Sequence, residues 1–167
     1  VNVSPIQIRR DDMPKRVRGA LAVSGLPANA LELEITESLL MGDDSHAFGV
    51  LATLKEIGIK LAIDDFGTGY SNLAYLKRFD VDRLKIDQSF VRGIDTRPDA
   101  GAIVGAVIEM GKRLGLNTLA EGVESEPERA ALHAAGCDDI QGYLLGRPMT
   151  EEALTQLLEK QAASRNK

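Results

Sequence analysis

Residues 59–71 read IKLAIDDFGTGYS, and this stretch decides how the rest of the chain is interpreted. The first five residues predict a buried strand, and the carboxylates of Asp64 and Asp65 follow at its carboxyl end. Burying two like charges side by side is unfavourable by several kcal/mol unless a positive group neutralises them, and a divalent cation with oxygen ligands is such a group. The alternative is a glycine-rich turn in which both acids are solvated.

Strands and helices alternate along the whole sequence. Apolar patterns predict strands at about 1–4, 31–37, 59–63, 81–87, 116–124 and 140–145. A helix follows each strand, at about 11–23, 45–57, 71–78, 99–114, 126–135 and 150–161. Because strands that alternate with helices form a parallel sheet, we expect an α/β fold of about six βα units.

Each junction between a strand and its helix carries polar side chains that a pure core would exclude. They are Asn2, Glu34 with Glu37, Asp64 with Asp65, Lys85 with Asp87, Glu121 with Glu124, and Gln141. Parallel α/β folds bind ligands at the carboxyl ends of their strands, so these junctions predict one convergent site. The convergence favours a functional role for Asp64 and Asp65 over a solvated turn.

The candidate metal ligands are all oxygen donors. They are Asn2, Glu34, Asp64, Asp65 and Glu121. This donor set suits Mg²⁺ or Mn²⁺ and disfavours metals that prefer sulfur. The crowding of carboxylates suggests two ions bridged by Asp64 or Asp65, and a two-metal site is the usual means of activating water for phosphodiester cleavage.

Lys85 shares a strand face with Arg83 and Asp87, because side chains alternate with a period of two along a strand. If that face is directed into a barrel, Lys85 lies close to the acids and can orient the attacking water or stabilise negative charge. The alternative is a structural ion pair with Asp87 or Glu121.

The remaining polar residues have weaker assignments. Glu37 is expected to support the glycine loop or to cap a helix. Glu124 is either a substrate contact or a helix cap, since a helix start follows it. Gln141 is expected to face the site, with packing inside the barrel as the alternative, and Tyr143 is assigned to packing.

Composition narrows the class of protein. A chain of 167 residues with 44% hydrophobic and 27% charged residues forms one packed domain. The net charge of −5 argues against binding a nucleic-acid polymer, whose partners are basic. The single cysteine excludes an intrachain disulfide, and no apolar run has the length of a membrane span. We expect a cytoplasmic segment without membrane contact, free or part of a membrane-anchored parent protein.

The ordered motifs resemble the EAL-domain family of cyclic di-GMP phosphodiesterases. The resemblance rests on NVS (2–4), ELEITES (32–38), DDFGTGYS (64–71), LKIDQSF (84–90), AEGVE (120–124), and QGYL (141–144) with RP (147–148). It covers nearly the whole chain. It implies a modified (β/α)8 TIM-barrel fold and hydrolysis of cyclic di-GMP to the linear dinucleotide.

The resemblance also implies residue roles. The ligands of two Mg²⁺ or Mn²⁺ ions would be Asn2, Glu34 and Asp64 for one ion, and Asp64 and Asp65 for the other, with Glu121 nearby as ligand or base. Lys85 would hold the attacking water. The substrate and water network would comprise Asp87, Glu124 and Gln141. Glu37 would brace the loop 65–71, with its Gly67, Thr68 and Gly69, which in the family lies at the dimer contact.

One departure from the family is large. The family is named for a Glu-Ala-Leu tripeptide on an early strand, and the sequence has no counterpart of that strand, whereas a full TIM barrel needs about 250 residues. We therefore expect residues 1–162 to form the carboxyl-terminal portion of the domain, truncated to six βα units, with a frayed tail at 163–167. We also expect exposed barrel edges that favour a homodimer, and weak or absent activity.

Two other functions are compatible with parts of the pattern. One is a degenerate, non-hydrolysing cyclic di-GMP receptor, which would be expected to have lost some of the acids that are intact here. The other is a different TIM-barrel metalloenzyme that uses a lysine base, which would not explain the whole ordered motif set.

Overall fold

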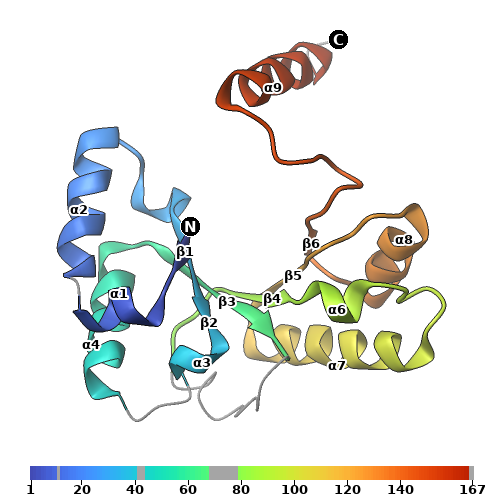
Figure 1. The fold of residues 1–167 in the computed structure, drawn as a ribbon, viewed down its shortest axis with the longest axis horizontal. Coiled ribbons are helices and arrows are strands. Elements are labelled where there is room, and N and C mark those ends of the chain that lie inside the picture. The colour runs from blue at the N-terminus through green and yellow to red at the C-terminus, as the bar shows by residue number, and fades with distance from the viewer. Residues whose placement is uncertain (11, 41–43, 68–78, 166–167) are drawn as a thin grey trace.

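The computed structural model describes residues 1–10, 12–40, 44–67 and 79–165, and in this part of the chain six parallel strands form one sheet (Figure 1). The strands are β1 (Asn2–Val3), β2 (Glu32–Thr36), β3 (Lys60–Phe66), β4 (Arg83–Ile86), β5 (Asn117–Ala120) and β6 (Asp139–Ile140). Their spatial order equals their sequence order, and every neighbouring pair is parallel. This is the wall of a (β/α) barrel left open between β1 and β6, which confirms the predicted fold class.

Helices connect the strands. They are α1 (Pro5–Arg10), α2 (Met13–Ser24), α3 (Glu37–Leu40), α4 (Ser45–Ile57), α6 (Gln88–Val91), α7 (Pro98–Leu114), α8 (Glu126–Ala135) and α9 (Glu151–Arg165), with a 3-10 turn η1 (Ala28–Ala30). The helix expected at 71–78 lies outside the described residues. Helix α1 was not predicted, because Pro5 was interpreted as the end of a strand; it is instead the first helical residue, where a missing N–H leaves no bond unmade.

The end of the chain differs from expectation at two places. The strand predicted at 140–145 is only two residues long, because Gly142 brings the chain into a turn directly after β6. Helix α9 continues to Arg165, four residues beyond the helix end predicted near 161. Alanine and glutamine in this stretch are good helix formers, and no proline or glycine interrupts them.

The strand faces explain where the core lies. Alternate residues of the central strands, such as Leu33 and Ile35 in β2 and Leu84 and Ile86 in β4, are buried at 0–3% exposure. They pack with apolar residues of the surrounding helices in two hydrophobic clusters. The intervening residues of the same strands are polar or charged and lie on the opposite face of the sheet. That face carries the candidate site.

Helix α9 stands apart from the sheet in Figure 1, joined to it by an extended stretch. Its described side chains are all exposed, among them Leu154, Leu157 and Leu158. Across the described ranges, no helix has both the length and the apolar character needed to cross a membrane.

Two glycines provide a test of this packing. Gly105 lies inside α7 with open space where a Cβ would be, whereas a Cβ on Gly142 would overlap the backbone of Val123. We expect Gly105→Ala to stabilise the chain by about 0.5–1 kcal/mol, through helix propensity. Gly142→Ala should destabilise it by about 1–3 kcal/mol, because the turn after β6 must move. Urea denaturation of both variants measures the difference, and equal midpoints would contradict the packing described here.

Candidate functional site

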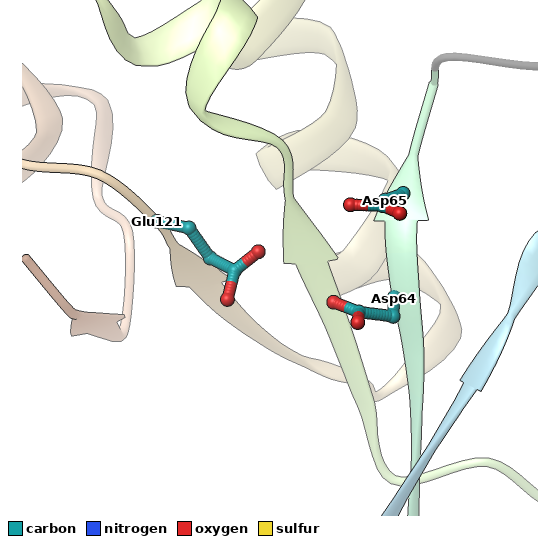
Figure 2. A group of neighbouring side chains, drawn as sticks. All are labelled: Asp64, Asp65 and Glu121. Atoms are coloured by element: carbon teal, nitrogen blue, oxygen red, sulfur yellow. The ribbon is translucent and has the colours of Figure 1, made fainter. Parts of the chain in front are cut away.

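The two aspartates lie within strand β3 rather than in the loop after it. The pairing of β3 with β4 shifts register between Ile63 and Phe66, so a bulge falls at Asp64 and Asp65. Asp65 has a φ of 53°, in the left-handed region that aspartate tolerates better than most residues. In a regular strand, consecutive side chains point to opposite faces. The bulge removes this restriction, and Figure 2 shows both carboxylates directed to the side where Glu121 lies.

These three acids form a compact oxygen cluster. Asp64, Asp65 and Glu121 each offer one carboxylate oxygen, and these oxygens lie within 4.8 Å of one another. Glu121 follows β5 directly, and its backbone N–H donates to the carbonyl of Ile86 in β4 at 3.1 Å. Three convergent carboxylate oxygens suit a hard divalent cation such as Mg²⁺, Mn²⁺ or Ca²⁺.

Lys85 lies at the centre of the acids. Its Nζ is 2.7 Å from Asp64 Oδ1, 2.9 Å from Glu34 Oε2 and 2.9 Å from Glu121 Oε1. The lysine is only 4% exposed and its partners' side chains are 14–20% exposed, so these ion pairs are partly shielded from water. Strands β2, β3 and β4 and the residue after β5 are therefore joined by one ammonium group.

Within the described part of the chain, the carboxylates that contact Lys85 are those of Glu34, Asp64 and Glu121, and Asp87 is not among them. Its side chain instead accepts a hydrogen bond from the backbone N–H of Ser89 at 3.0 Å and caps α6. Of the two structural partners suggested for Lys85 from the sequence, the structure therefore pairs it with Glu121.

Burial and neighbouring charges shift the pKa values of Asp65, Glu121 and Lys85. Burial raises the pKa of Asp65 above its usual value, and the neighbouring Asp64 and Asp87 carboxylates add to the increase. Burial also raises the pKa of Glu121, although Lys85 partly opposes it. Burial lowers the pKa of Lys85, but its hydrogen bonds to Asp64, Glu121 and Glu34 outweigh this effect and leave the pKa above the usual value for lysine. Lys85 is therefore a permanent cation at neutral pH.

A second set of charged residues lies on the same face of the sheet, nearer the amino-terminal ends of the strands than Lys85. Arg83 lies 2.8 Å from Asp139 Oδ2 and 3.6 Å from Glu32 Oε1. Because Arg83 and Lys85 are two residues apart on β4, both face the barrel interior, as the period of two predicted. The arginine links β2, β4 and β6 beneath the site.

Asn2 lies farther out than the central acids. It pairs with Glu34 in the register of β1 and β2, and it is exposed at the edge of the sheet. The three-carboxylate cluster does not include Glu34, which instead contacts Lys85.

Beside the cluster lies a cleft of about 310 Å³. It is lined by Asp87, Gln88, Arg92, Glu121, Gly122, Glu124, Gln141, Gly142 and Tyr143. The sequence singled out Asp87, Glu121, Glu124 and Gln141 in this group, but it missed Gln88 and Arg92, because α6 is a single turn without periodicity. The assignment of Tyr143 to packing was wrong: this residue is 52% exposed, and the Arg147 guanidinium lies 4.4 Å from its ring centroid.

A buried glutamate fixes the chain after β5. Glu128 is 8% exposed and accepts hydrogen bonds from the backbone N–H groups of Glu124, Ser125 and Gly93. Burial acts to raise the pKa of Glu128, but these backbone donors hold it below its usual value. The sequence reasoning missed this residue, although the spacing Ser125-x-x-Glu128 is the signature of a capping box.

A second buried glutamate lies beside the bulge. Glu37, the first residue of α3, accepts a hydrogen bond from Gly67 N–H at 3.3 Å, and Gly67 has a φ of 96°. Among the described residues, Glu37 Oε1 is buried without a hydrogen-bond partner. Thr68 and Gly69, which the sequence assigned to the same support, lie outside the described residues.

Comparison with known proteins identifies relatives of this chain in sequence and in structure. The EAL domain family model matches residues 1–148. The cyclic di-GMP phosphodiesterase NbdA of Pseudomonas aeruginosa is 42% identical over 158 residues, covering 95% of this chain and 20% of that protein. The structure of the PaMucR phosphodiesterase in complex with c-di-GMP superposes with a TM-score of 0.87 at 43% identity, covering 92% of this chain and 62% of that one.

A further structure bears on the metal. The manganese and c-di-GMP complex of Klebsiella pneumoniae BlrP1 has a TM-score of 0.83 at 36% identity, covering 89% of this chain and 38% of that one. The chain spans about a fifth of the curated relatives it matches, with coverage of 19–23% of their length.

The raised pKa values of Asp65 and Glu121 predict how metal binding depends on pH. A ligand whose pKa is raised holds its proton to higher pH, and the cation must displace that proton. We expect the affinity for Mn²⁺ to be constant at alkaline pH and to fall on acidification, starting above the usual pKa values of 3.8 for Asp65 and 4.5 for Glu121. Calorimetric titrations from about pH 8 to about pH 5 measure this profile.

A matched control is Asp99→Asn, which removes an exposed carboxylate paired with Arg97, outside the cluster. This variant should leave the profile unchanged. An affinity that stays constant throughout the acidic range would contradict the prediction.

Proposed function

We propose that this chain, which belongs to the EAL domain family, is the carboxyl-terminal, metal-binding portion of a cyclic di-GMP phosphodiesterase domain. The observation that carries the proposal is the joining of Asp64, Asp65 and Glu121 with Lys85 at the carboxyl ends of β3, β4 and β5. Acids grouped around one lysine at this end of a parallel sheet are typical of a catalytic site. The proposed domain comprises residues 1–162.

The proposed cofactor is a pair of Mg²⁺ or Mn²⁺ ions. Asn2, Glu34 and Asp64 would hold one ion, and Asp64 and Asp65 would hold the other, with Glu121 as an additional ligand or base. The three-carboxylate cluster supports the second position, because its oxygens already converge within 4.8 Å. When bound, such ions lower the pKa of a coordinated water and offset the charge of a phosphodiester in its transition state.

The remaining proposed roles are hydrogen-bond donation, proton acceptance and support of the backbone, and each is assigned to a different side chain. Lys85 is held as an ammonium and can donate to an attacking water or to a phosphate oxygen. The raised pKa of Glu121 makes it a stronger base than an ordinary glutamate, which suits proton acceptance from that water. Glu128 supports this role indirectly, since it fixes the backbone that follows Glu121.

The proposed substrate is cyclic di-GMP, the ligand in the PaMucR and BlrP1 structures. The cleft beside Glu121 offers a guanidinium from Arg92, the amides of Gln88 and Gln141, and the exposed ring of Tyr143. These groups match the phosphates and the purine edges and faces of a cyclic dinucleotide. Arg92 lies 3.9 Å from Glu124, so an arriving phosphate would compete with that carboxylate.

The loop after β3 is proposed to serve two purposes. Glu37 holds Gly67 and so limits the movement of the preceding bulge. The segment 65–71, or the open edges of β1 and β6, would form the contact of a homodimer, because an unpaired strand edge is a template for pairing with another chain.

The proposal is tested by adding cyclic di-GMP in the presence of Mn²⁺ and measuring heat and product together. We expect metal-dependent binding, and turnover at least about 100-fold below that of a complete EAL domain, because the open sheet leaves the site incomplete on one side. Asp64→Asn should abolish both signals. Asp99→Asn is again the matched control and should change neither.

The outcomes separate the candidate functions. Binding without any turnover would favour the non-hydrolysing receptor. Metal binding with no interaction with the dinucleotide would favour a different metalloenzyme. Turnover equal to that of a complete domain would contradict the expected effect of the open sheet.

A further inference from the structure

Lys85 and the expected metal ions share their ligands. The lysine ammonium contacts Glu34, Asp64 and Glu121, and two of these acids, Asp64 and Glu121, also belong to the cluster that can hold a cation. A carboxylate oxygen that accepts an ammonium hydrogen bond at 2.7 Å is not equally available to a metal ion.

We propose that Lys85 is a built-in counter-cation, which occupies these shared carboxylates in the metal-free chain and sets the affinity of the site for divalent ions. This inference rests on the proposed function, since it concerns the same site. It goes beyond it by assigning Lys85 a second role, the regulation of metal binding, in addition to its contact with water or phosphate.

The donor count of the ammonium supports the proposal. An ammonium carries three N–H donors and no acceptor, and Lys85 has three carboxylate partners at 2.7–2.9 Å. One hydrogen bond, to Asp64, and two ion pairs, to Glu34 and Glu121, therefore hold the ammonium within the site itself. A divalent ion that engages the same oxygens of Asp64 and Glu121 competes with two of the three contacts.

The electrostatics point in the same direction. Four carboxylates, those of Glu34, Asp64, Asp65 and Glu121, gather around one ammonium group. Without Lys85 their mutual repulsion would be uncompensated, and a group of like charges that is partly shielded from water attracts cations. The lysine thus stabilises the metal-free fold and at the same time weakens metal binding.

The position of Lys85 makes the competition unavoidable. The residue is 4% exposed on the central strand β4, with the contacted acids on β2, on β3 and immediately after β5. The ammonium remains close to the cluster when metal binds. The N–H donors of Lys85 that no longer contact Asp64 and Glu121 are then available for an anionic ligand. Metal binding and phosphate binding are therefore coupled through the Lys85 side chain.

The test replaces Lys85 by methionine, which has a similar shape and no charge. Calorimetric titration with Mn²⁺ compares the unaltered chain, Lys85→Met and Lys55→Met. Lys55 is a matched control, because it also forms short contacts to a carboxylate, 2.7 Å to Asp82, but outside the cluster. We expect Lys85→Met to bind Mn²⁺ at least about tenfold more tightly, and Lys55→Met to bind as the unaltered chain does.

Each outcome decides the question. Tighter binding by Lys85→Met, or binding by that variant alone, supports the proposal. If the unaltered chain binds Mn²⁺ and Lys85→Met binds it equally tightly or more weakly, the proposal is overturned and the proposed function remains intact. If neither the unaltered chain nor Lys85→Met binds Mn²⁺, the proposed metal site and this inference are both overturned.

A second measurement covers the case in which Lys85→Met does not fold without metal. Nuclear magnetic resonance of the Lys85 ammonium in the unaltered chain reports on its hydrogen bonds directly. We expect the ammonium resonance to shift during titration with Mg²⁺, and the midpoint of this shift to equal the midpoint of Mg²⁺ binding. An ammonium resonance that stays unchanged while Mg²⁺ binds would overturn the proposal.

Discussion

The buried ion-pair network around Lys85 is the interaction on which the rest of the site depends. A single ammonium on β4 contacts carboxylates from β2, from β3 and from the chain after β5. Without this cation, four acids on the interior face, three of them partly buried, would repel one another. The outer faces of the same strands are apolar and pack against the helices. Strand alternation therefore separates the molecule into a stabilising face and a chemical face.

The second constraint is the bulge in β3. Two consecutive residues of a regular strand point to opposite sides, so Asp64 and Asp65 could not both serve one site. The register shift and the positive φ of Asp65 bring both carboxylates to Glu121. The Glu37–Gly67 hydrogen bond lies directly after this bulge and holds it from the first residue of α3, which follows the neighbouring strand β2. A local departure from ideal backbone geometry is thus supported by an element distant in sequence.

Acids of the same type have different tasks because their partners differ. Burial, together with the neighbouring Asp64 and Glu34 carboxylates, raises the pKa of Glu121 against the opposing effect of Lys85, and the raised pKa suits Glu121 for proton transfer. Glu128, seven residues later, is buried among backbone N–H groups that lower its pKa, so it remains ionised and serves as a structural brace. Two glutamates close together in sequence therefore cannot be assigned to one function by proximity.

The sequence alone determined the α/β class, the parallel sheet and most helix ends, because apolar periodicity, capping residues and glycines act locally. It also identified the acids at the strand ends, since charged residues beside buried strands need a reason. Only the tertiary structure decided which acids meet: Asp64, Asp65 and Glu121 converge, while Asp87 caps a helix and Asn2 lies at an edge. The cleft residues Gln88 and Arg92, and the contact of Glu128 with Gly93, also emerged only there. The physical reason is that a side chain's role depends on distances and burial, which arise when separate strands pack together and which no local pattern records.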